Sequence, residues 1–135
     1  MSVDFKNIKW KAVGQGVGIA FLISIGVTFC VITGYSGYLG FQAQGAPDIE
    51  MIGSFASGVG VGIAAVFTGI GAFAGSLFAA RKADTDILQN GMMVGVITAV
   101  FTLLLNTLSI WTMVSFFFAL GGGWLGGRFA TSKQS

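Results

Sequence analysis

Residues 12–47, AVGQGVGIAFLISIGVTFCVITGYSGYLGFQAQGAP, decide the fold because they contain no Asp, Glu, Lys, Arg or His. Residues 51–80 and residues 87–127 are equally free of these side chains. A helix needs roughly 20 apolar residues to cross about 30 Å of hydrocarbon, so the first two stretches can each cross once and the third can cross twice. Continuous apolar runs favour helices, because a membrane barrel would show alternating segments of about ten residues. We therefore expect an all-α, integral membrane four-helix bundle.

The composition restricts the chain to a single transmembrane domain over residues 1–135. Its residues are 54% hydrophobic and 9% charged, whereas soluble domains carry about 25% charged residues. A net charge of +2 argues against a nucleic-acid partner. With no histidine and a lone Cys30, the chain has neither an intramolecular disulfide nor an imidazole metal site. We expect no cofactor, no metal and no enzymatic activity.

The predicted architecture is two tandem helical hairpins behind a short interfacial helix. Phe5, Ile8 and Trp10 can face lipid while the neighbouring lysines face water, which predicts an interfacial helix over residues 1–11. Proline is tolerated in a first helical turn, so Pro47 fits the start of the second span. The spans are expected at about 12–39, 51–80, 91–105 and 110–127.

The distribution of basic residues predicts the orientation. Four spans place all seven Lys and Arg residues on one side, and leave Asp48 and Glu50 on the other. The positive-inside rule then puts both termini in the cytoplasm. Aromatic and basic residues near the span ends are expected to anchor the helices at the headgroups: Trp10, Lys11, Arg81, Lys82, Trp124 and Arg128.

Glycine is the second strong signal, with 22 residues of this type. Many are four apart, the spacing that clears a groove for close helix approach in lipid. The helix-packing glycines expected from this pattern are Gly14, Gly18, Gly26, Gly58, Gly62, Gly71, Gly75, Gly122, Gly123, Gly126 and Gly127. These grooves can pack against other helices of the same bundle, or they can pack against a helix of another chain. The second span carries glycine on more than one face, which keeps the latter alternative open.

A polar stripe runs along the third span, where Thr98, Thr102 and Asn106 recur at fourfold spacing on one helix face. Such side chains either bond between helices inside the bundle or line a polar pathway. Proton-coupled transporters generally place ionisable groups within the membrane, and these spans contain no Asp, Glu, Lys, Arg or His. This argues against the pathway.

Four short motifs carry a resemblance: Ile8-Lys9-Trp10-Lys11-Ala12-Val13 before a glycine, Gly71-x-x-x-Gly75-x-x-x-Ala79-Ala80-Arg81, Asn90-Gly91-x-x-x-Gly95, and Leu125-Gly126-Gly127-Arg128-Phe129-Ala130. In these motifs the chain resembles a family of small, glycine-rich, uncharacterised four-span proteins of the bacterial inner membrane. Its members place a proline before the tryptophan of the fourth span, where this chain has Ile110. The resemblance implies four spans and a bacterial inner membrane, and it implies no activity.

These observations favour a non-catalytic, multi-pass membrane protein. We expect a structural or accessory subunit that packs through glycine-rich helix faces in a larger membrane complex. A small homo-oligomeric channel or transporter is the alternative. The expected partners are the lipid bilayer and either other membrane subunits or further copies of the chain.

Overall fold

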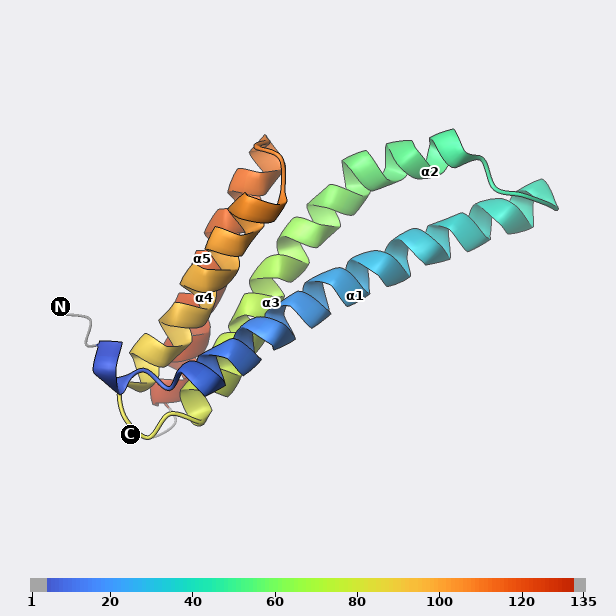
Figure 1. The fold of residues 1–135 in the computed structure, drawn as a ribbon. Helices are drawn as coiled ribbons and strands as arrows, with labels where there is room; N and C mark the ends of the chain where they lie inside the picture. Colours follow the sequence, from blue (N-terminus) through green and yellow to red (C-terminus); the bar gives the residue numbers. More distant parts are fainter. Residues whose placement is uncertain (1–4, 133–135) are drawn as a thin grey trace.

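The computed structural model describes residues 5–132, which form helices joined by short connectors (Figure 1). A single 3₁₀ turn, Phe5–Asn7, precedes the helices. The α-helices are α1 (Trp10–Ala43), α2 (Ile49–Phe55), α3 (Val61–Arg81), α4 (Ile87–Leu105) and α5 (Ile110–Ser132), with a π-helical turn, Ala56–Gly60, joining α2 to α3. The second span is therefore α2, the π turn and α3 together.

Four spans among the described residues are long and apolar enough to cross a membrane, which confirms the all-helical membrane architecture. Several ends lie outside the predicted limits, because α1 runs to Ala43, α4 begins at Ile87 and α5 continues to Ser132. The end of α4 at Leu105 and the start of α5 at Ile110 agree with the prediction. Of the predicted interfacial segment 1–11, residues 1–4 lie outside the described residues. The described part contains only the Phe5–Asn7 turn before α1 begins at Trp10.

The interior of the bundle is built from small residues, and many of the large apolar ones face outward. The fully buried apolar side chains are mostly alanines, among them Ala65, Ala72 and Ala99. In contrast, Leu22 is 75% exposed and Phe117 is 67% exposed. This arrangement suits lipid, because helices associate there through close packing of small residues while large side chains contact acyl chains.

Helix α3 lies at the centre of the bundle, against α1, α4 and α5. The two hairpins pack together at the end that holds both termini, and α1 and α2 lean away from α4 and α5 at the other end (Figure 1). At about 1.5 Å per residue, the 34 residues of α1 span roughly 51 Å. The first hairpin thus extends well beyond the second.

The π turn bends the second span over the outer part of α1. Its sequence is ASGVG, and small residues of this kind let a backbone widen where the i to i−4 hydrogen bonds are interrupted. Beyond the bend, the ring of Phe55 stacks on Tyr35 of α1 with 4.0 Å between centroids. This contact closes the outer end of the first hairpin.

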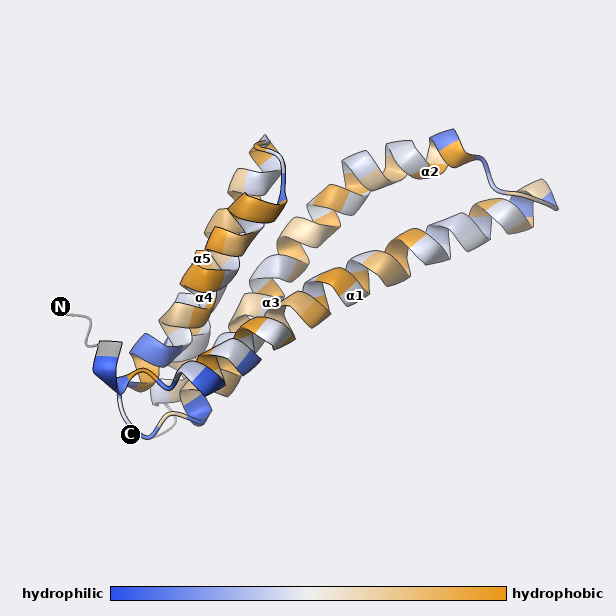
Figure 2. Cartoon of the chain, in the orientation of Figure 1, coloured by the Kyte–Doolittle hydropathy of each residue, from blue (hydrophilic) through white to orange (hydrophobic). Residues whose placement is uncertain are grey.

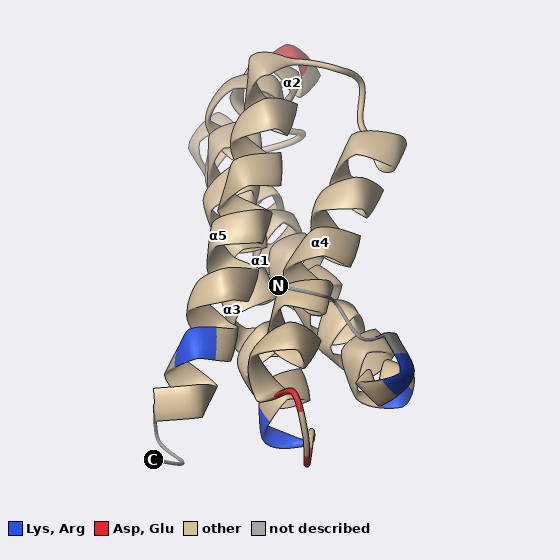
Figure 3. Ribbon diagram, turned by 90° about the vertical axis from the view of Figure 1, so that its left-hand side faces the viewer, with Lys and Arg blue, Asp and Glu red and all other residues tan. Residues whose placement is uncertain are grey.

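The charged residues sit where the predicted topology requires them. Lys and Arg gather at the end that carries both termini, and α2 at the opposite end shows acidic residues only (Figure 3). Between these ends the helices are mainly apolar, and the strongly hydrophilic positions lie at the basic end, in the connectors and at the outer ends of α1 and α2 (Figure 2).

Candidate functional site

The basic half of the bundle is closed by direct contacts between helix backbones. A Cβ added at Gly16 of α1 would lie 2.5 Å from the carbonyl oxygen of Gly75 in α3. One turn further, a Cβ at Gly71 would lie 2.5 Å from the carbonyl oxygen of Ala20. Only glycine permits such approaches. The α1–α3 pair is therefore tightly held up to the level of Ala20.

The second hairpin joins this pair through further glycines. Gly126 of α5 packs on Phe73 and Ser76 of α3, and Gly91 and Gly95 of α4 pack on α5. The buried Ser76 Oγ donates a hydrogen bond to the carbonyl oxygen of Gly123 over 2.6 Å. These contacts fix the hairpins to each other at the basic end.

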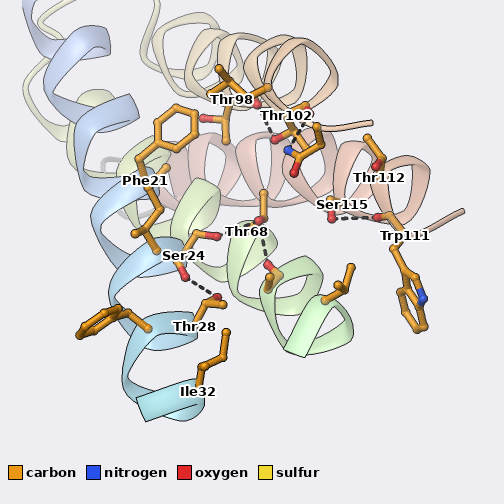
Figure 4. A pocket seen from close by; sticks show the side chains of 17 residues that line it. Phe21, Ser24, Thr28, Ile32, Thr68, Thr98, Thr102, Trp111, Thr112 and Ser115 are labelled. Atoms are coloured by element: carbon orange, nitrogen blue, oxygen red, sulfur yellow. Dashed lines mark hydrogen bonds between the residues drawn. The ribbon is translucent and has the colours of Figure 1, made fainter. Parts of the chain in front are cut away.

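Above this closed half, the diverging helices leave a cleft of about 490 Å³ between the two hairpins (Figure 4). Its polar lining consists of seven hydroxyl residues and one amide: Ser24, Thr28, Thr68, Thr98, Thr102, Asn106, Thr112 and Ser115. Its apolar walls include Phe21, Phe29, Leu105 and Trp111. None of the described residues that line the cleft is charged.

Nearly all the hydroxyl hydrogens of the cleft are used within or between its own helices. Thr102 Oγ1 donates to the carbonyl oxygen of Thr98 over 2.8 Å, and Asn106 Nδ2 donates to that of Thr102 over 2.9 Å. Thr28, Thr68, Thr112 and Ser115 likewise bond to carbonyls of their own helices or connector. Because Thr68 Oγ1 donates to Ala64, Ser24 Oγ supplies the hydrogen of the 2.9 Å bond between the two side chains.

Thr98 is the exception among these side chains. Its residue is 1% exposed, and Oγ1 has no hydrogen-bond partner among the described residues. Figure 4 draws it at the same end of the cleft as Phe21, beyond the turn where Thr102 lies. A buried hydroxyl without a partner loses the hydrogen bonds it would make in water. The closed end of the cleft thus contains one unsatisfied polar group.

The predicted polar stripe lies along this cleft, since Thr98, Thr102 and Asn106 all line it. Their hydrogen bonds differ from the interhelical bonding that we expected, because Thr102 and Asn106 bond to carbonyls within α4. A hydroxyl that bonds one turn back keeps its hydrogen inside its own helix, and its remaining lone pairs face the cleft.

The predicted packing glycines divide into two groups. Gly71, Gly75, Gly122, Gly123, Gly126 and Gly127 are buried against neighbouring helices, and Gly62 faces the Trp111 ring, where a Cβ would lie 3.6 Å from it. In contrast, a Cβ at any of Gly14, Gly18, Gly26 or Gly58 would have no described atom within 4 Å beyond the backbone of its own helix and its chain neighbours. The latter four therefore do not pack the interior of this chain.

Sequence spacing missed several residues that close the bundle. Gly16, Gly69, Gly91 and Gly95 all make close interhelical contacts, although Gly69 and Gly16 fall outside the fourfold pairs that we used. The buried Asn90, 0% exposed, appears in the sequence analysis only within a motif that carries the resemblance. Its position among backbone groups of the N-terminal segment and the connector could not be read from spacing.

The predicted anchors lie at the basic end. Trp10 and Lys11 are exposed at the start of α1. Arg128 lies over the Trp124 ring, 5.1 Å from its centroid. Lys82 lies 4.5 Å from the centroid of Phe78, and its Nζ donates to Gln15 Oε1 over 3.3 Å. Cation–π contacts of this kind hold a charged group beside apolar surface.

Fold and site together define a multi-pass α-helical membrane protein with an uncharged, hydroxyl-lined cleft between two hairpins. No protein-family model, curated protein or solved structure matches the chain. Among residues 5–132, no group of three or more His, Cys, Asp and Glu side chains could hold a metal ion.

Proposed function

We propose that this protein is a non-catalytic subunit that packs through the outer part of its first hairpin against another membrane polypeptide. The observation that carries the proposal is the unpartnered surface of α1. In the most apolar 18-residue window of α1 only 11% of residues are buried, against 39% in each of the other spans. A Cβ at Gly26, Gly34 or Gly37 would have no described atom within 4 Å.

Glycine destabilises a membrane helix on its own and stabilises it where another helix packs closely against it. Each glycine in a helix interior costs about 1 kcal/mol relative to alanine. At Gly16 and Gly71 this cost is offset by close backbone packing inside the chain. At Gly26, Gly34 and Gly37 the described chain provides no such contact. A helix of another membrane polypeptide would supply it.

A small homo-oligomeric channel or transporter is the second candidate, and the hydroxyl-lined cleft favours it. Thr98, Thr102 and Asn106 form a polar wall that copies of the chain could bring together around an axis. The direct contacts of Gly16 with Gly75 and of Ala20 with Gly71 close the basic end. A pathway therefore needs either opening of these contacts or a route between subunits.

We expect native mass spectrometry of gently extracted protein to give a mass equal to this chain plus a defined larger membrane partner. In Gly34→Leu and Gly37→Leu variants, the partner should be lost while the thermal stability of the isolated chain changes little, because both positions are open. Gly121→Leu is the matched control, since it fills an equally open position on α5. A mass that is a simple multiple of this chain would contradict the accessory role and favour the homo-oligomer.

For the location, we propose the bacterial cytoplasmic membrane with both termini in the cytoplasm. The positive-inside rule supports this orientation, because basic residues gather at the end that carries the termini (Figure 3). The resemblance to four-span bacterial proteins supports the choice of membrane.

Labelling of single cysteines tests the orientation. In a Cys30→Ala background, a membrane-impermeant maleimide added to intact cells should label Ala46→Cys in the connector after α1. It should label Thr85→Cys, in the connector after α3, only after the cells are opened. Both positions are exposed. The reverse pattern would place the termini outside the cytoplasm.

A further inference from the structure

We propose that the cleft between the two hairpins is a binding site for an uncharged lipid that carries a hydroxylated headgroup, such as a monoacylglycerol. The proposal concerns the cleft itself and does not depend on the packing role of α1. It follows from three properties of the lining: its charge, its hydrogen-bonding capacity and the shape of its walls.

The charge of the lining excludes an ionic headgroup from the deep part of the site. Within the described lining no side chain is charged, and an unpaired charge moved into such surroundings would lose its solvation. A phosphate or an ammonium group would find no counter-charge there. The chemistry that remains is that of neutral groups able to donate and accept hydrogen bonds.

The donors and acceptors of the cleft lining indicate which neutral groups of a ligand can bind there. Thr28, Thr68, Thr102, Thr112 and Ser115 each donate to a carbonyl oxygen, and Ser24 donates to Thr68. A hydroxyl that donates once still has acceptor capacity. The described hydroxyls therefore offer the cleft mainly acceptors, and Thr98 Oγ1 offers a donor without a partner. A ligand hydroxyl complements both, because it donates to the acceptors and accepts from Thr98.

The shape of the cleft accommodates an acyl chain attached to such a headgroup. Thr98 lies at the same end of the cleft as Phe21 (Figure 4), and Phe21 follows Ala20, whose backbone packs against Gly71 of α3. Towards the outer end the lining combines open apolar side chains with the polar groups of Thr28, Asn106 and Thr112. Ile25 is 64% exposed there, Phe29 is 68% exposed and Leu105 is 70% exposed. The volume of about 490 Å³ lies within the usual range of ligand pockets. The headgroup fits the closed end, and the chain continues along the exposed wall into the bilayer.

Trp111 provides a reporter within the site. It lines the cleft and is 42% exposed, while Trp124, outside the cleft lining, is also 42% exposed. A Trp10→Phe, Trp124→Phe variant retains only Trp111, and a Trp10→Phe, Trp111→Phe variant retains only Trp124. Both proteins are placed in phosphatidylcholine nanodiscs and titrated with a monoacylglycerol brominated on its acyl chain. The brominated methyl ester of the same fatty acid serves as the ligand control.

We expect saturable quenching of Trp111 by the brominated monoacylglycerol at low mole fraction, with Trp124 quenched only in proportion to bulk lipid. The methyl ester, which lacks hydroxyls, should quench both tryptophans alike. Thr98→Val should weaken the saturable binding about fivefold, the effect expected for losing one hydrogen bond. Thr131→Val is the matched control, because Thr131 Oγ1 bonds to the carbonyl oxygen of Gly127 on α5, outside the cleft lining.

Two results would overturn the proposal. Equal, non-saturable quenching by the monoacylglycerol and the methyl ester would make the cleft an ordinary lipid-facing groove. Absence of Trp111 quenching by either compound would mean that water or another polypeptide fills the cleft. If Thr98→Val lowers thermal stability, Ala64→Phe gives an independent test, because Ala64 also lines the cleft and a larger ring there should abolish saturable quenching.

Discussion

Replacing Gly75 with valine should prevent the two helices of the first hairpin from packing, and it should lower the free energy of unfolding by at least about 3 kcal/mol. A Cβ at Gly75 would collide with the carbonyl oxygen and carbonyl carbon of Gly16. A flexible side chain could move aside, but here the obstacle is the backbone of the facing helix. Gly16→Val should have a comparable effect, because it meets the same contact from α1.

The control for this prediction lies two residues away on α1. Gly18→Val introduces the same side chain into the same helix, where a Cβ would have no described atom within 4 Å. Unfolding in mixed detergent micelles, followed by circular dichroism, should separate Gly16→Val and Gly75→Val from Gly18→Val. Equal destabilisation by Gly16→Val and Gly18→Val would indicate a general cost of β-branched residues in α1. It would contradict the role of the close backbone contact between Gly16 and Gly75.

The sequence was sufficient to predict the class of fold. Long stretches without charged side chains indicate membrane helices. Asp48, Arg81 and Arg128 end three such stretches, and the third is long enough to cross the membrane twice. The helix ends were less predictable, because polar residues such as Gln42 and Gln89 continue a helix as well as they form a connector. The π turn at Ala56–Gly60 was also missed, since its glycines are equally compatible with a straight helix.

The candidate site was predictable in part. Fourfold spacing correctly put Thr98 and Thr102 on one face of α4, and Asn106 follows directly after the end of that helix. Spacing within one helix does not predict which other helices diverge from it. The cleft lies where the two hairpins diverge, and Ser24 and Thr68 of the first hairpin line it together with this stripe. Likewise, the fourfold pattern of glycine treats Gly14 and Gly71 alike, although only Gly71 meets a neighbouring backbone. Contacts between hairpins are properties of the folded chain.

Asn90 joins three segments at the basic end of the bundle. Its Oδ1 accepts a 2.8 Å hydrogen bond from the backbone N–H of Lys9, and its Nδ2 donates to the carbonyl oxygens of Thr85 and Asp86. Lys9 Nζ also pairs with the Asp84 carboxylate and donates to the carbonyl oxygen of Lys82 over 3.3 Å. Next to these bonds, Ile8 is buried in a cluster with Val13, Ala79 and Val94. The segment before α1 is thereby held against the connector after α3.

Asn90→Ala should lower the free energy of unfolding by about 2 kcal/mol, because it leaves the Lys9 N–H and the Thr85 carbonyl oxygen without their partner. The Asp86 carbonyl oxygen keeps the hydrogen bond from the backbone N–H of residue 90. Hydrogen exchange at the Lys9 amide should accelerate at least about tenfold, since local release of this segment no longer breaks a hydrogen bond to Asn90. Asn106→Ala is the matched control: Asn106 is exposed and bonds only within α4, so Lys9 exchange should stay unchanged.

Asn90→Asp separates the two halves of this network. The carboxylate can still accept from the Lys9 N–H, but it cannot donate to Thr85 and Asp86, and its charge would be buried against their carbonyl oxygens. We therefore expect Asn90→Asp to be at least as destabilising as Asn90→Ala at neutral pH, even though its shape is preserved. A neutral effect of Asn90→Asp would show that the bond to Lys9 alone holds the junction. In that case the N-terminal segment, rather than the connector, would be the element that Asn90 positions.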